Sequence, residues 1–123
     1  MHDLFLEGVA HFNAHDFFEC HDCWEELWMD TIGHDKLFYQ GMIQVAVGYY
    51  HASHGNFTGA RSLFDKALPK LRPYAPLHRR VDLATLLPVF ETHAAAFEQS
   101  ARGILSFDSN NAPTIHLVDN SVS

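Results

Sequence analysis

The sequence predicts an all-α protein, a single compact bundle of about five helices followed by an irregular C-terminal tail. Three observations lead to this prediction: apolar residues recur every three to four positions, turn-forming residues separate the periodic segments, and 47% of the residues are hydrophobic. A chain of 123 residues is long enough to bury about two-thirds of its unfolded surface around one core. We therefore expect one helical domain at 1–105 and a loosely ordered tail at 106–123.

The first two helices are expected at about 3–12 and 16–30. The first is short and has its apolar residues on one face. The second begins with Asp16 and Glu19, which have the spacing of a capping box, a pair of side chains that satisfy backbone amides at a helix start. Gly33 lies in the break that follows.

The third helix is expected at about 36–53. Gly55 and Asn56 then supply a stop and the cap of a fourth helix. Further along, Asp82 is expected to cap a short turn, and Pro88 fits the first turn of a separate fifth helix, where its missing N–H costs nothing.

Charge is divided unevenly along the chain. Residues 1–60 contain nine acidic residues and one lysine, a net charge of −8, and seven of the ten histidines. This balance disfavours nucleic acid as a partner, because nucleic-acid binding proteins present basic surfaces. The longest uncharged segment is interrupted by polar side chains, so no membrane span is expected, and the absence of an export signal near Met1 predicts a cytoplasmic location.

Two polar residues lie beside the expected inner face of the second helix. On a wheel of about 100° per residue, Phe17 and Trp24 share one face, and His21 falls between them. Glu25 lies four residues after His21, at the edge of the same face. We expect both polar groups to face the core.

The third helix carries a narrow polar stripe. Most of its surface is apolar, but Gln40, Gln44 and His51 fall within about 40° of one another. Gly41 and Gly48 lie next to this stripe and would allow a neighbouring helix to approach closely. A buried polar group without a partner costs about 1–3 kcal/mol, so we expect the two polar sets to meet in one pocket.

Two interpretations of this pocket stay open on the residues alone. In one, His21, Glu25 and His51 bind a divalent metal ion, or they bind a small ligand, with Gln40, Gln44 and Asn56 as further pocket residues. In the other, the same residues form a hydrogen-bond network with a purely structural role.

Cys20 and Cys23 form a C-x-x-C sequence, which is typical of redox and zinc sites. There is no second cysteine pair, and both residues lie inside an expected helix without a neighbouring strand. We therefore expect no thiol chemistry here.

Two blocks of the sequence resemble a known family. The first is F-N-A-H-D-F-F-E-C-H-D-C-W-E-E-L-W at 12–28, and the second is F-Y-Q-G-M-I-Q-V-A-V-G-Y-Y-H at 38–51, followed by G-N-F-T-G-A at 55–60. Both are similar to the signature of the domain-of-unknown-function family numbered 309, which occurs in bacteria and archaea.

The resemblance implies a small all-α fold and no established activity. Asp22 departs from the family pattern, which usually has Glu there, and the two cysteines are not part of the pattern. The motif positions fall on these residues: Asn13, Phe18, Glu19, His21, Trp24, Glu25, Trp28, Gln40, Gly41, Gln44, His51 and Asn56.

Two functions therefore compete. The first is divalent-metal or small-ligand binding in the inter-helix pocket, with metal-assisted hydrolysis as the reaction that such a centre would support. The second is a non-catalytic helical module that binds another protein, with a pocket that only fixes the helix register. Three protein ligands around an open position would favour the first, and exposed aromatic area on the second or fourth helix would favour the second.

Overall fold

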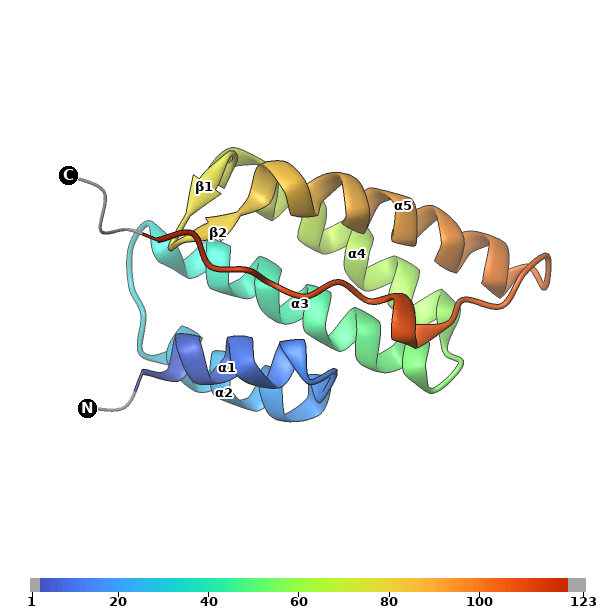
Figure 1. Cartoon of the computed structure of the whole chain (residues 1–123), viewed down its shortest axis with the longest axis horizontal. Coiled ribbons are helices and arrows are strands. Elements are labelled where there is room, and N and C mark those ends of the chain that lie inside the picture. Colours follow the sequence, from blue (N-terminus) through green and yellow to red (C-terminus); the bar gives the residue numbers. More distant parts are fainter. Residues whose placement is uncertain (1–2, 120–123) are drawn as a thin grey trace.

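Helix α3 (Asp35–Ser53) is central to the fold and has helices packed on two sides. In the computed structural model, which describes residues 3–119, α1 (Leu4–Asn13) and α2 (Phe17–Met29) form an antiparallel pair on one side of α3. Helices α4 (Phe57–Leu71) and α5 (Leu83–Ala101) lie on the other side (Figure 1). This arrangement confirms the predicted all-helical bundle.

Glycines set the distance between α3 and α4. A Cβ atom at Gly41 would lie 2.8 Å from Leu71, and one at Gly48 would lie 2.6 Å from Phe64. Both distances are shorter than packed carbon atoms tolerate, so only glycine permits this approach. The expectation that a neighbouring helix packs against the two glycines is confirmed.

The start of α2 differs from the expected capping box. Asp16 occupies the N-cap position, but its side chain accepts no backbone hydrogen bond there. Its carboxylate instead lies 3.9 Å from the Nδ1 atom of His11, at the end of the preceding helix. By contrast, the predicted cap at Asn56 is present, since its Oδ1 atom accepts a hydrogen bond from the Gly59 N–H at 3.0 Å.

Helix α5 is continuous, and the expected short turn followed by a separate helix is wrong. Asp82 caps the single helix by accepting a hydrogen bond from the Thr85 N–H at 3.2 Å. Pro88 lies inside the helix and deprives the Ala84 carbonyl of its usual donor. Ala84 and Pro88 are both exposed, so water can satisfy that carbonyl.

A short hairpin and the C-terminal tail close one end of the bundle. The 3₁₀ turn η1 (Arg72–Tyr74) leads into strand β1 (Leu77–His78), which pairs antiparallel with β2 (Val81–Asp82). The tail includes a second 3₁₀ turn, η2 (Ser109–Asn111), and runs back along the bundle to the hairpin (Figure 1).

The tail is not loosely docked over its described part. Phe107, Ala112 and Ile115 are buried in the core, and Asn13 on α1 exchanges two hydrogen bonds with the Ile115 backbone, at 2.9 Å and 2.6 Å. The Val118 N–H donates to the Arg80 carbonyl at 2.8 Å. Residues 120–123 of the expected tail lie outside the described residues.

Candidate functional site

A small pocket opens between α2 and α3 at the place where the two polar sets were expected to meet. It has a volume of about 120 Å³. His21 comes from α2 and His51 from α3, thirty positions later in the sequence. The remaining lining residues are apolar or aromatic: Phe17, Phe18, Val47 and Tyr50. The pocket therefore combines two imidazole rings with three aromatic side chains.

The His21 side chain is surrounded by oxygen atoms of its own helix. Its Nδ1 atom lies 3.3 Å from the Phe18 carbonyl oxygen and 3.3 Å from an Asp22 carboxylate oxygen. Its Nε2 atom lies 3.2 Å from the Glu25 carboxylate. The Phe18 ring stacks at a tilt beside the imidazole, with ring centroids 5.6 Å apart. Negative charge and an aromatic ring therefore meet at this side of the pocket.

Glu25 does not face the core as expected. Its side chain is 51% exposed and lies over His21 on the outer surface of α2. A wheel position at the edge of a face leaves a long carboxylate side chain free to turn toward water, which avoids the cost of burying its charge. Glu25 therefore contributes charge near the pocket without lining it.

Of the pocket residues expected from α3 and the α3–α4 turn, His51 lines the pocket and the others do not. Gln40 and Gln44 do not line the pocket, and the Gln44 Oε1 atom is buried without a hydrogen-bond partner. Asn56 caps α4, and its side-chain amide lies 3.5 Å from the Nδ1 atom of His51. Asn56 thus orients His51 from outside the pocket.

The donor set does not form a three-ligand metal centre. Within residues 3–119, no three His, Cys, Asp or Glu side chains lie in an arrangement that would hold a metal ion. His21 and His51 share the pocket, but Glu25 is placed on the outer surface.

The two cysteines have environments that suppress thiolate formation. Burial raises the pKa of Cys20 well above its usual range. Burial and a hydrogen bond from the Cys23 thiol to Glu7 raise the pKa of Cys23 to about 11. Since the thiolate is the reactive form, both environments disfavour a reactive thiol.

A polar pair in the core was missed by the sequence analysis. The hydroxyl of Tyr49 on α3 lies 2.7 Å from the Nδ1 atom of His93 on α5. Burial raises the pKa of Tyr49 and lowers the pKa of His93. The available signal was the position of His93, three residues after Phe90 and four before Phe97, on the buried face of α5.

The fold and the pocket define a class of protein: a small all-helical protein with an aromatic, histidine-bearing pocket between two of its helices. Residues 5–63 match the family described as "Domain of unknown function (DUF309)". This segment contains α1 from its second residue, α2, α3 and about half of α4, and therefore the whole pocket. The resemblance expected from the sequence is confirmed.

The chain is also similar to the uncharacterized protein YpuF of Bacillus subtilis (strain 168). The two are 34% identical over 80 residues, which are 63% of this chain and 44% of the relative. The match thus spans less than half the length of that protein. Among the described residues, the helices are each too short or too polar to cross a membrane.

Proposed function

We propose that this protein binds a small organic cation in the pocket between α2 and α3. The observation that carries the proposal is the convergence of His21, His51 and three aromatic side chains on one pocket of about 120 Å³. A dry cavity of about 150 Å³ accommodates benzene, so this pocket fits a compact group of a few heavy atoms.

The charge around the pocket favours a cation. Asp22 and Glu25 lie beside His21, and residues 1–60 have a net charge of −8. Aromatic faces attract cations through the ring quadrupole, and quaternary ammonium groups are bound in this way by cages of several rings. Phe18 and Tyr50 supply such faces here, and the Phe17 ring, which stacks on His15 and Tyr49, lines the pocket beside them.

A divalent metal ion is the competing small ligand. His21, Glu25 and His51 would have to supply it, and a metal bound there would support the hydrolytic chemistry considered above. Both nitrogens of His21 already face oxygen atoms on α2, so the ring would have to turn to coordinate a metal. The arrangement therefore favours the organic cation.

A protein partner is the second candidate function. Phe18 on α2 is 47% exposed, and this is the kind of exposed aromatic area on α2 that favours an interaction surface. An amine-bearing side chain of a partner would use the same aromatic faces. Binding of the free cation is the simpler form of the proposal, and it is the one tested first.

The test is an NMR titration of the ¹⁵N-labelled protein with choline, with its uncharged isostere dimethylbutanol, and with Zn²⁺. Choline is expected to shift the amide signals around Phe18, Tyr50 and His51 saturably, and dimethylbutanol to bind at least tenfold more weakly. Equal affinities would show an apolar pocket without cation selection and would overturn the proposal. Tight Zn²⁺ binding that His21→Ala and His51→Ala each abolish would replace the cation with a metal.

A further inference from the structure

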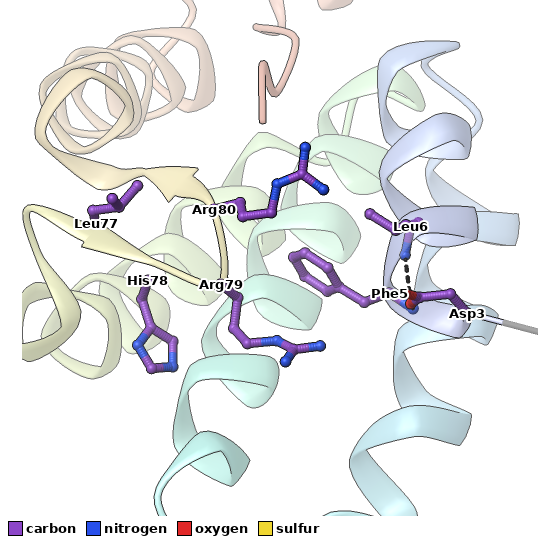
Figure 2. A pocket seen from close by; sticks show the side chains of 7 residues that line it. All are labelled: Asp3, Phe5, Leu6, Leu77, His78, Arg79 and Arg80. Carbon is purple, nitrogen blue, oxygen red and sulfur yellow. Dashed lines mark hydrogen bonds between the residues drawn. The ribbon is translucent and has the colours of Figure 1, made fainter. Parts of the chain in front are cut away.

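A second cavity, separate from the α2–α3 pocket, lies between the start of α1 and the β1–β2 hairpin. Its volume is about 400 Å³, within the range of small-molecule sites. Figure 2 shows that Arg79 and Arg80 reach from the hairpin toward α1, one on either side of the Phe5 ring. Leu6 and Leu77 add apolar surface, and Asp3 lies at the α1 edge.

The two arginines occupy backbone positions that arginine disfavours. The strand register pairs His78 with Val81, so Arg79 and Arg80 form a two-residue turn. Their φ angles are +49° and +65°, both in the left-handed region. Turns of this kind favour Asn-Gly, because these two residues tolerate a positive φ better than other residues do. Strained residues of this kind cluster at ligand-binding sites.

The surrounding structure holds both side chains in place. The Arg80 Nε–H donates to the Val118 carbonyl at 2.8 Å, and this bond ties the residue to the tail. The Arg79 guanidinium lies 5.7 Å from the Phe5 ring centroid and 6.0 Å from that of Tyr39. Phe5 and Tyr39 are buried, so the arginine rests on a fixed aromatic surface.

Arg79 and Arg80 line the cavity, whereas Arg61 and Arg72 are engaged in ion pairs elsewhere. Arg61 is paired with Asp65 at 2.9 Å, and Arg72 is paired with Glu91 at 3.0 Å. The acidic side chain that lines the cavity beside Arg79 and Arg80 is Asp3, in a chain whose acidic residues outnumber the basic ones by 15 to 8. The cavity therefore presents two guanidinium groups against one carboxylate among the residues that line it.

We infer that this cavity binds a small organic phosphate, with its phosphoryl group held by the Arg79 and Arg80 side chains and its organic part against the exposed side chains of Leu6 and Leu77. Guanidinium groups bind phosphate oxygens through paired N–H donors, and two of them match a dianion. A phosphate ion alone would leave much of a 400 Å³ cavity empty. One Asp3 oxygen accepts the Phe5 and Leu6 N–H groups, but its negative charge opposes the ligand.

The experiment compares phenyl phosphate, inorganic phosphate and benzyl alcohol by calorimetry. Phenyl phosphate is expected to bind at least tenfold more tightly than either of the others, because only it has both the charge and the apolar body. Equal binding of inorganic phosphate would show a general anion site, and equal binding of benzyl alcohol would show an apolar cavity. Either result would overturn the inference.

Variants of the turn provide the sharper test. The double variant Arg79→Asn/Arg80→Gly removes both guanidinium groups and keeps a sequence that this turn favours, and it should raise the dissociation constant for phenyl phosphate at least tenfold. Asp3→Asn keeps a good helix cap and should tighten binding several-fold. Arg102→Gln removes the same charge at the distant end of α5 and should leave binding unchanged.

Two results would contradict the assignment of these arginines. In the first, the Asn-Gly variant binds phenyl phosphate as well as the parent protein does. In the second, Arg102→Gln weakens binding as much as the turn variant, which would indicate a general effect of net charge.

Discussion

Single residues in the core make contacts that composition alone does not reveal. Trp24 is fully buried, and its indole N–H donates to the Phe5 carbonyl at 3.1 Å. A Cβ atom at Gly8 would overlap the same indole. Gly8 therefore occurs in the middle of α1 because the tryptophan occupies the space that another side chain would need.

Gly8→Ala should destabilise the protein, although replacing a mid-helix glycine by alanine ordinarily stabilises a helix by about 0.5–1 kcal/mol. Overpacking against Trp24 is expected to lower the free energy of unfolding by about 1–3 kcal/mol, measured by urea denaturation. Trp24→Phe provides the control, since the smaller ring should relieve the overlap and make the double variant less unstable than the two single changes predict. A gain in stability from Gly8→Ala would show that the two helices are further apart.

His93 should make stability depend on pH. Burial lowers the pKa of His93 in the folded protein. In the unfolded chain the same side chain has the ordinary pKa of about 6.5, so it takes up a proton at a higher pH than it does in the folded protein. The unfolded state then binds more protons, so the free energy of unfolding should fall as the pH drops below about 6.5. His93→Gln keeps an acceptor for Tyr49 without titrating, and it should show a smaller fall between pH 7.5 and 5.5. Identical slopes would contradict this role.

At the scale of elements, the sequence predicts which segments are helical better than it predicts where they begin. Apolar periodicity identified the five helices of the described residues. A helix that packs on a core repeats its apolar residues every three to four positions, and this repeat can be read from the local sequence. The break assigned at Pro88 was wrong because the stripe of Leu83, Phe90 and Phe97 continues through it. An exposed proline near a helix start costs little enough for packing to override it.

The site shows a similar division between what spacing can predict and what it cannot. His21 and His51 were expected to meet because each interrupts an apolar face, and the structure places them in one pocket. Glu25 and Gln44 have equally suggestive positions on their helices. Where these two side chains lie depends on their rotamers and on neighbours from other helices. The periodicity of a single helix does not predict either.

The α4 cap provides a prediction at this scale. Asn56→Ala removes the acceptor for the Gly59 N–H and should lower the free energy of unfolding by about 1 kcal/mol. Asn56→Asp keeps the acceptor oxygen and should lose much less, as measured by thermal or urea denaturation. Equal losses from both changes would place the role of Asn56 in its contact with His51 rather than in the cap.

At the scale of the whole molecule, the tail joins distant parts of the chain. It contacts α1 through Asn13, the core through Phe107, and the hairpin through Arg80. Its polar composition suggested loose docking, but its few apolar residues are spaced to fill gaps between helices. The conformation of such a segment is determined by the helix surface on which it packs. Its own sequence therefore shows little periodicity.

Removing the Asn13 side chain should loosen the tail. Asn13→Ala leaves the Ile115 N–H and carbonyl without their partners and is expected to cost about 1–3 kcal/mol. Cleavage of the tail by a nonspecific protease should become faster at the same time. Asn13→Asp keeps an acceptor for the Ile115 N–H and should give an intermediate effect, whereas an unchanged cleavage rate in Asn13→Ala would show that the tail is held elsewhere.

We propose that the α2–α3 pocket selects a cation through its aromatic faces. The most direct test is the ratio of the choline affinity to the dimethylbutanol affinity, measured in the parent protein and in Phe18→Leu. Leucine keeps apolar volume but removes one ring, and Phe18 is exposed enough for the fold to tolerate the change. A ratio of at least ten is expected in the parent and a several-fold smaller ratio in the variant, since one ring contributes about 0.5–2 kcal/mol to cation binding. The same ratio in both proteins, or a ratio of one in the parent, would contradict cation selection by the pocket.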